Sequence, residues 1–428
     1  MLPRYVIIQI LKYFGGYYEL RGFWKFIYTL NLVSKEWNDN IVPHLFLSKQ
    51  PTCIVNNISD LKKYQFNGKF LQLSLNINNA KLERFYHDSP MDSTFHQNIT
   101  SMKLDDHCFI KQLPSQLKHL QVNIEGDILK SPFNSIVTRL NQSLTSLQLV
   151  IGIEFQLTSL IVSNCQYNLT QLILLGRPTM LIPFKNPNML NEFTKLQTLQ
   201  IEHLYCEVPS LIYTLKTMKS LKNFEYFHNY ICIATQLFQD VITTHQSLEK
   251  VKLKTTTLLE MDIIISSLNS NTVLKELRIQ GTAIVPQICC TNSVIEIFQI
   301  NNCQFPLWSV PSSLREIDMH HINGIQQPNL FEGFYTIHPQ CEQISISIEH
   351  ITSSLIAKTK SLNMKSLKSI VLYMSTNELH TKDYQWISNS LLTGFQNYHK
   401  LLFYPRIFDS IQDKHGLEYT VIDIRFEC

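Results

Sequence analysis

The sequence predicts an α/β fold: a solenoid with parallel strands on its concave face and helices or irregular returns on its convex face, preceded by a small all-α domain. Three observations support this prediction. A short apolar motif recurs at a steady interval, several segments between its copies carry apolar residues at helical spacing, and residues 1–47 hold helical patterns of their own. Hydrophobic residues make up 44% and charged residues 17% of the 428 residues, a balance that favours a folded core over disorder.

The recurring motif is L-x-x-L-x-L, with an apolar residue of any kind at its three fixed positions. Clear copies begin at residues 117, 144, 169, 196, 221, 248 and 274, so consecutive copies are 25 to 27 residues apart. Weaker copies begin at residues 70, 99, 295, 314, 341 and 367. Alternating apolar residues favour a short strand with one buried face, and stacked copies give a parallel sheet. This motif and period resemble leucine-rich repeats, and the resemblance implies a repeat array over residues 69–395.

The segments between the motifs predict the returning half of each repeat. Residues 211–218 and 261–268 have apolar residues three or four apart, which favours helices. A motif-like match at 157–162 falls halfway between two strands, so we assign it to a return. The copies at 117 and 314 follow short steps and a P-S-x-L phrase, which favours a tight turn or an extended path. Residues 396–428 form a predicted C-terminal cap, in which "YTVIDIRFEC" is a closing strand or cap.

The first residues form an apolar run that has to be distinguished from an export signal. Gln9 and Lys12 interrupt the run, and bulky residues follow it where a signal peptide has small ones. Apolar residues at spacings of three and four instead predict amphipathic helices, with Pro3 in a first turn and Gly15 at a helix end. We therefore expect a helical domain over residues 1–47 and a connector over 48–68.

Three short motifs follow one another in this domain. They are Leu2-Pro3, the tetrapeptide "ILKY" at 10–13, and "LNLVSKEW" at 30–37. The segment resembles an F-box, with two departures: Arg4-Tyr5 stand where the family often has acidic residues, and the stretch 15–23 is longer than usual. The alternative is a plain helical cap on the repeats.

An F-box joined to leucine-rich repeats resembles the substrate receptors of cullin-type (SCF) ubiquitin ligases. The resemblance implies that the F-box binds a Skp-type linker of the cullin complex, that the repeats bind an unknown client protein, and that the chain itself performs no catalysis. The linker-binding residues would be Leu2, Pro3, Ile7, Ile10, Leu11 and Val33, and the F-box core would be Phe14, Leu30 and Trp37. The alternative function is a leucine-rich-repeat interaction scaffold with a helical N-terminal cap and no ubiquitin role.

Catalytic, metal and cofactor motifs are absent from the sequence. There is no G-x-S-x-G, P-loop, H-E-x-x-H or zinc-type cysteine spacing, so we expect no cofactor and no metal. His107-Cys108 and His320-His321 could touch a metal, but their places at or beyond repeat strands favour loop histidines. The net charge of +3 is too small to predict nucleic acid or membrane as the main partner. Ten scattered cysteines favour reduced thiols and a cytoplasmic location, and leave the nucleus open.

The variable positions of the motifs predict a client-binding face. Side chains at these positions point away from the core, and successive repeats bring a set of cations together: Lys250, Lys252, Lys254, Lys275 and Arg278. Such a cluster could hold an acidic or phosphorylated segment. The alternative is a solvated sheet face on which Glu249 and Glu276 neutralise these cations.

Overall fold

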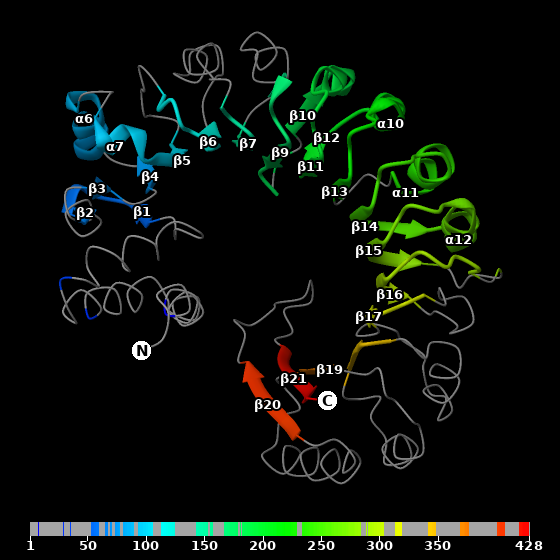
Figure 1. Ribbon diagram of the computed structural model, residues 1–428. Helices are drawn as coiled ribbons and strands as arrows, with labels where there is room; N and C mark the ends of the chain where they lie inside the picture. The colour runs from blue at the N-terminus through cyan, green and yellow to red at the C-terminus, as the bar shows by residue number, and fades with distance from the viewer. Residues whose placement is uncertain are drawn as a thin grey trace. The chain divides into compact units, whose positions relative to one another are not determined.

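The computed structural model describes residues 7, 29, 35, 53–59, 65–66, 69–70, 73–77, 80–89, 93–105, 113–124, 143–152, 155–156, 167–178, 180, 182–228, 233–283, 288, 290–303, 313–318, 341–347, 369–375, 400–406 and 419–427 (Figure 1). The chain divides into two compact units. Unit 1 is Met1–Arg177 with Glu192–Lys195, and unit 2 is Pro178–Asn191 with Leu196–Cys428.

Unit 1 contains parallel strands that follow one another in chain order. They are β1 (Cys53–Val55), β4 (Leu73–Ile77), β5 (Ile99–Leu104), β6 (His119–Ile124), β7 (Ser146–Ile151) and β9 (Gln171–Gly176). Helices α6 (Ala80–Asp88) and α7 (Thr94–Gln97) follow β4, β2 (Gln65–Phe66) pairs antiparallel with β3 (Lys69–Phe70), and β8 is Phe155–Gln156. β1 falls in the stretch predicted as a connector. Its Val55 is fully buried and pairs in register with Leu75, so the parallel sheet begins before the first predicted repeat.

Unit 2 also contains parallel strands that follow one another in chain order, and its last strands pair antiparallel. The parallel strands are β11 (Thr198–Glu202), β13 (Asn223–Phe227), β14 (Lys250–Leu259), β15 (Glu276–Ala283), β16 (Ile297–Cys303), β17 (Glu316–Asp318), β18 (Gln343–Ser347) and β19 (Ser369–Ser375). β21 (Tyr419–Glu427) then pairs antiparallel with both β19 and β20 (Lys400–Arg406). The predicted closing strand is β21, and this antiparallel pairing ends the parallel order.

Every predicted repeat strand coincides with an observed strand. The reason is the alternation that the motif imposes: along β7, β9 and β11, buried residues alternate with half-buried ones. The buried positions pair with buried positions across the strands, as in Leu199, Phe224 and Val251, each 0% exposed. One apolar layer therefore runs from strand to strand within each unit. The buried layer fixes the pairing register, because a shift of one residue would turn all these side chains to solvent.

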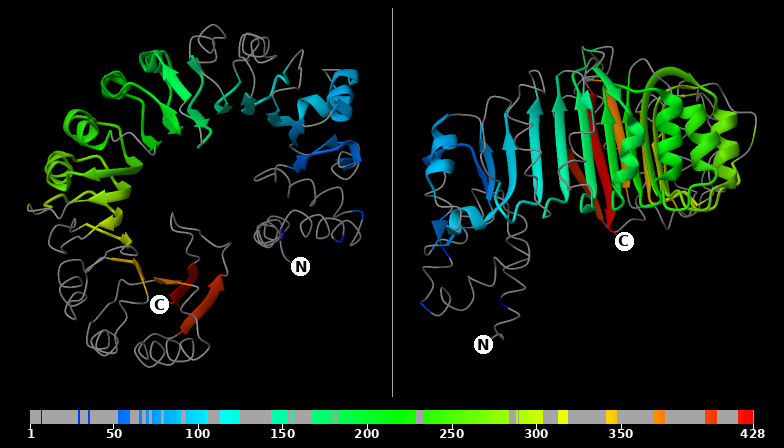
Figure 2. Two further views of the ribbon diagram at one scale, coloured as in Figure 1. Left: turned by 180° about the vertical axis from the view of Figure 1, so that it is seen from behind. Right: turned by 90° about the horizontal axis from the view of Figure 1, so that it is seen from above.

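The predicted return helices of unit 2 are present, and they lie on one side of the strands (Figures 1 and 2). α10 (Val208–Thr217) buries Leu211 and Leu215, and α12 (Met261–Ser270) buries Ile265 and Leu268. The return between β13 and β14 is instead α11 (Ala234–Gln236), which continues into a π-helical turn, η3 (Leu237–Ile242). The return before β11 contains a 3₁₀ turn, η2 (Pro187–Glu192), and β10 (Ile182–Lys185) pairs with β12 (Leu204–Tyr205).

The sequence predicts short returns before the motif copies at 117 and 314, and the structure describes the turn at the first of them. Before β6, the amide of Leu117 donates to the carbonyl of Pro114 at 3.1 Å, which is the tight turn that the P-S-x-L phrase predicts. The return predicted at 157–162 lies outside the described residues, as do the first two residues of the second P-S-x-L phrase, at 311–312.

A serine ladder joins successive repeats, and the sequence reasoning missed it. The hydroxyl of a serine directly before the first motif residue donates to the carbonyl of the first motif residue in the preceding repeat. The pairs are Ser143 to Leu117 at 2.7 Å, Ser220 to Leu196 at 2.8 Å, Ser247 to Leu221 at 2.9 Å and Ser313 to Ile295 at 2.6 Å. The signal was present as a recurring Ser in front of the motif.

A second ladder lies three residues before the first motif residue, at His245, Asn271 and Asn292. Each side chain accepts a hydrogen bond from the amide of the first motif residue that follows it. Each also reaches a carbonyl in the preceding repeat: His245 Nε2 lies 3.2 Å from the Met218 oxygen, and Asn271 Nδ2 lies 2.6 Å from the Ile242 oxygen. A neutral histidine with its proton on Nε2 thus performs the same task as an asparagine amide.

We expect His245 to make stability pH-dependent. Burial lowers the pKa of His245, and hydrogen bonding to the Met218 carbonyl offsets only part of this effect. The unfolded chain therefore binds more protons than the folded chain below about pH 6.5, so stability falls as the pH drops through this region. Protonation also puts a hydrogen on Nδ1, which faces the amides of Ser247 and Leu248.

The substitution His245→Asn tests this expectation, because the ladder itself accommodates asparagine. Thermal midpoints measured at pH 7.5 and pH 5.5 should differ less in the variant than in the wild type. A residual difference is expected, since burial also lowers the pKa values of His96 and His228. An unchanged pH dependence in His245→Asn would show that another group dominates the acid sensitivity.

Candidate protein-binding face

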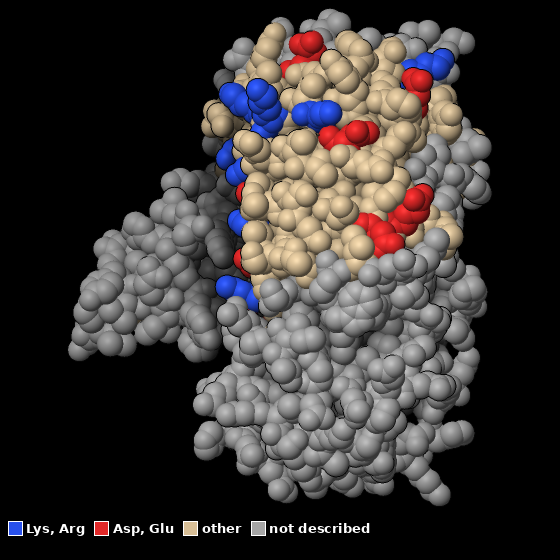
Figure 3. Space-filling model, turned by 90° about the vertical axis from the view of Figure 1, so that its right-hand side faces the viewer, with Lys and Arg blue, Asp and Glu red and all other residues tan. Residues whose placement is uncertain are grey.

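The side of the unit 2 sheet opposite the apolar layer carries polar and charged side chains, and we call it the open face. Its members stand in rows because the strands pair in register. We define it by Thr198, Gln200, Glu202, Asn223, Glu225, Phe227, Lys250, Lys252, Lys254, Glu276, Arg278, Gln280, Gln299 and Glu316. The outer side of this unit differs, because it shows scattered charges on a mostly uncharged described surface (Figure 3).

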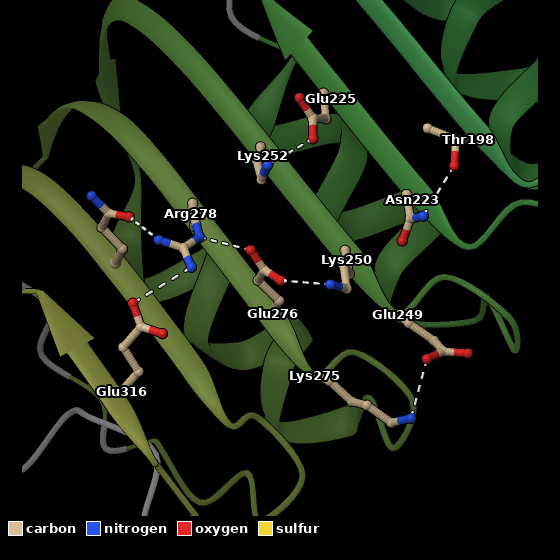
Figure 4. Close-up of polar contacts among 11 residues, drawn as sticks. Thr198, Asn223, Glu225, Glu249, Lys250, Lys252, Lys275, Glu276, Arg278 and Glu316 are labelled. Atoms are coloured by element: carbon tan, nitrogen blue, oxygen red, sulfur yellow. Dashed lines mark hydrogen bonds and ion pairs between the residues drawn. The ribbon is translucent and has the colours of Figure 1, made fainter. Parts of the chain in front are cut away.

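Cross-strand ion pairs connect most of the charged residues of the open face (Figure 4). Lys252 Nζ lies 2.8 Å from Glu225 Oε1 on the neighbouring strand, and Lys250 Nζ lies 3.1 Å from Glu276 Oε2. At the edge where the strands begin, Lys275 Nζ lies 3.1 Å from Glu249 Oε2. Since both members of the Lys252–Glu225 and Lys275–Glu249 pairs are partly exposed, we expect these two pairs to fix side-chain positions more than to add stability.

Glu276 is the centre of this network. Its side chain is 8% exposed and accepts from Arg278 Nε at 2.7 Å as well as from Lys250. Burial alone raises the pKa of Glu276, but hydrogen bonds and charges from Arg278 and Lys250 outweigh that effect, so the pKa lies below its ordinary value. Glu276 therefore remains ionised at neutral pH and holds two cations in place.

Arg278 is fixed from three directions. Besides the bond from Nε to Glu276, Nη1 donates to Gln299 Oε1 at 2.8 Å, and Nη2 lies 3.5 Å from Glu316 Oε1. The three partners come from the same strand and from the next two strands, and Figure 4 shows Glu276 and Glu316 on either side of the guanidinium group. Each nitrogen of Arg278 thus has an acceptor, which leaves little of its hydrogen-bonding edge for an incoming carboxylate.

We expect Glu276→Gln to lower stability by roughly 1–2 kcal/mol at pH 7, because Arg278 and Lys250 lose a shared charged acceptor. The folded-state pKa of Glu276 is depressed, so its contribution is complete above about pH 4.5 and is lost as the pH falls through the folded pKa. Urea unfolding at pH 7 and pH 3 should show the difference between wild type and variant shrinking in acid. Glu249→Gln is the matched control, since its pair with Lys275 is exposed; a comparable loss there would contradict the central place of Glu276.

The structure brings four of the five predicted client-binding cations into contact with carboxylates. Lys250, Lys275 and Arg278 pair with Glu276 or Glu249, the two carboxylates that the solvated-face alternative names. Lys252 pairs instead with Glu225. Lys254 is the exception among the five: no ion pair joins it to a carboxylate of the described residues. That the five bind a client remains a prediction.

The F-box residues are almost entirely outside the described residues. Of the predicted linker-binding set the structure describes Ile7, which is helical and half-buried. Leu2, Pro3, Ile10, Leu11 and Val33 lie outside the described residues, and so do the predicted core residues Phe14, Leu30 and Trp37. The F-box resemblance therefore stays a prediction from the sequence.

The described part of the chain contains no group of side chains arranged as a metal site, and two of its buried cysteines are unreactive. Its residues contain no group of three or more His, Cys, Asp or Glu placed to hold a metal ion. The candidates His107-Cys108 and His320-His321 lie outside the described residues. Burial raises the pKa of Cys206 to about 11 and that of Cys341 to about 12, so both thiols are protonated and unreactive at neutral pH. Among the described helices, none has the length and apolar character to cross a membrane.

In unit 1, the side of the sheet opposite the apolar layer carries other kinds of side chain than the open face of unit 2. It presents mainly hydroxyl and amide side chains that pair with each other across strands, such as Ser74 with Ser101 at 3.2 Å and Ser146 with Gln171 at 2.8 Å. Asn123 donates to Asp105 at 2.7 Å. The charged, cross-linked surface is thus a feature of unit 2.

Parallel strands that recur at this period, with returns on the opposite side, define a repeat solenoid with the strand and return pattern of leucine-rich repeats. No protein-family model matches the sequence, and no curated protein matches it. Among solved structures, the chain is similar to an internalin (InlF) from Listeria monocytogenes str. 4b F2365. The TM-score is 0.35 with 14% identity, over 71% of this chain and 72% of the internalin chain. The assignment rests on strand order and register, not on this distant likeness.

Proposed function

We propose that this chain is a leucine-rich-repeat scaffold that binds a partner protein on the open face of unit 2. The observation that supports this proposal is the network centred on Glu276 and Arg278. It holds charged side chains in defined positions, so little side-chain freedom remains to be lost when a partner binds. Repeat proteins use such extended sheet faces for recognition.

A random peptide library displayed on phage, panned against the full chain, tests the scaffold proposal. Binding of enriched peptides should fall roughly tenfold in Lys252→Glu, which reverses one charge of the open face. The matched control is Lys216→Glu, the same change on an exposed position of α10. Peptides that lose affinity equally for both variants, or that respond to no substitution on the open face, would place recognition elsewhere and overturn the proposal.

We propose a receptor role in an SCF-type ubiquitin ligase as the second candidate. It is supported by the F-box motifs at Leu2-Pro3, 10–13 and 30–37, which occur in the family's order. In this case the N-terminal domain would bind a Skp-type linker of the cullin complex, and the open face would hold the client near a separate ubiquitin-transferring enzyme. The chain would contribute position and no chemistry, in the cytoplasm or the nucleus.

A binding assay with a purified Skp-type linker separates the two candidates. The double variant Leu2→Ala/Pro3→Ala should abolish binding if the F-box is functional, while the thermal midpoint stays that of the wild type. No binding by folded wild-type protein would remove the ubiquitin role and leave the scaffold.

A further inference from the structure

The strand register leaves one lysine of β14 without a carboxylate neighbour. Lys250, Lys252 and Lys254 alternate along β14 and all project from the open face. Lys250 pairs with Glu276 on β15, and Lys252 pairs with Glu225 on β13. The first two lysines are therefore neutralised by the protein itself.

Lys254 meets different neighbours. Its register partners are Phe227 on β13 and Gln280 on β15, so a ring and an amide stand where its two predecessors have carboxylates. No ion pair joins Lys254 to a carboxylate of the described residues. Phe227 is itself unusual, because it is a half-buried aromatic residue on the polar side of a strand whose Phe224 is fully buried on the other side.

We propose that Phe227 and Lys254 form the recognition point for an extended acidic segment of the partner protein. The segment supplies the carboxylate that Lys254 lacks and an apolar side chain that covers Phe227. This inference rests on the proposed scaffold function and names the chemistry of its partner.

Geometry restricts the segment further. Phe227 and Lys254 lie on adjacent strands, which are about 4.8 Å apart. In an extended peptide, residues i and i+2 share a face and are separated by roughly 6.6 Å. The flexible stem of lysine covers the difference, so an acidic residue two positions from an apolar or aromatic one fits both contacts at once. A carboxylate here gains a charge-assisted hydrogen bond, while an aromatic partner gains apolar burial.

The peptide library panned against the full chain provides the probe. We expect enriched peptides to share an Asp or Glu two positions from an apolar or aromatic residue. Affinity for such a peptide should fall roughly tenfold in Lys254→Ala and in Phe227→Ala, and less than about twofold in Lys216→Ala. Thermal midpoints of the three variants should equal that of the wild type, since all three positions face away from the core.

An exchange of charges between protein and peptide distinguishes specific recognition from a general loss of binding. Lys254→Glu should reject the acidic peptide and bind a version in which lysine replaces the acidic residue, which a nonspecific defect cannot produce. Peptides that respond to Lys252→Glu but not to Lys254→Ala or Phe227→Ala would overturn this inference and leave the scaffold function. Peptides that respond to no open-face variant, or a library that yields none, would overturn both.

Discussion

Phe224→Ala is expected to lower the free energy of unfolding by about 3–5 kcal/mol, the range for removing a fully buried aromatic side chain. Phe224 is 0% exposed, and its register partners Leu199 and Val251 are equally buried. Its ring also stacks on that of Tyr226, with 6.3 Å between the ring centroids. Backbone hydrogen bonds hold the strands on both sides, so the walls of the cavity can collapse only slightly.

Urea unfolding followed by circular dichroism measures this loss, and hydrogen exchange locates it. Because each repeat contacts only its neighbours, protection should fall most in β11, β13 and β14 and recover in more distant strands. Phe227→Ala is the matched control: the same residue type in the same strand, on the open face, with an expected change within about 0.5 kcal/mol. Equal losses for Phe224→Ala and Phe227→Ala would contradict the assignment of the two faces of β13.

Asn271→Ala is expected to cost about 2–4 kcal/mol, although it removes few atoms. The buried Asn271 side chain donates to the Ile242 carbonyl at 2.6 Å and accepts from the amides of Val273 and Leu274 at 2.9 and 2.7 Å. Alanine leaves all three backbone groups without this partner, in a region that water enters poorly. The loss of stability is the cost of keeping these polar groups away from water without a hydrogen bond.

The exposed Asn269 provides the comparison for Asn271. Its side chain accepts a hydrogen bond from the amide of Thr291 at 2.7 Å, and solvent can replace this bond. Asn269→Ala should therefore change the urea midpoint by the equivalent of less than about 1 kcal/mol. A small effect of Asn271→Ala, similar to that of Asn269→Ala, would mean that the second ladder does not hold the repeats together.

The repeat strands could be predicted from sequence because their signal is local. Alternating apolar residues within six positions define each strand, and the recurrence of the motif at 25 to 27 residues defines the neighbours. The helices at 208–217 and 261–270 were predictable for the same reason, since their buried residues follow a local period. The π-helical turn at 237–242 was not, because its local pattern does not distinguish it from an α-helix.

The candidate site was predictable only in part. Alternation along the strands placed Lys250, Lys252, Lys254 and Arg278 on one sheet face, because every second residue of a strand points the same way. Lys275, the fifth predicted cation, precedes β15 and lies at the edge where the strands begin. The sequence could not assign their partners, which depends on which residue of one strand faces which residue of the next. Lys252 and Glu225 are 27 positions apart, and only the register of β13 and β14 brings them within 2.8 Å.

Local patterns in the sequence sufficed to predict a solenoid with the strand and return pattern of leucine-rich repeats, and to predict the buried face of each strand, because these properties follow from periods within one repeat. Strand pairing established which of these charges form ion pairs with carboxylates of the described residues. Lys250, Lys252 and Lys254 are equivalent in the sequence, and they become different only through the strands beside them. Two face a carboxylate and the third faces a phenyl ring, because electrostatic neighbours in a sheet are set by pairing across strands and not by order along the chain.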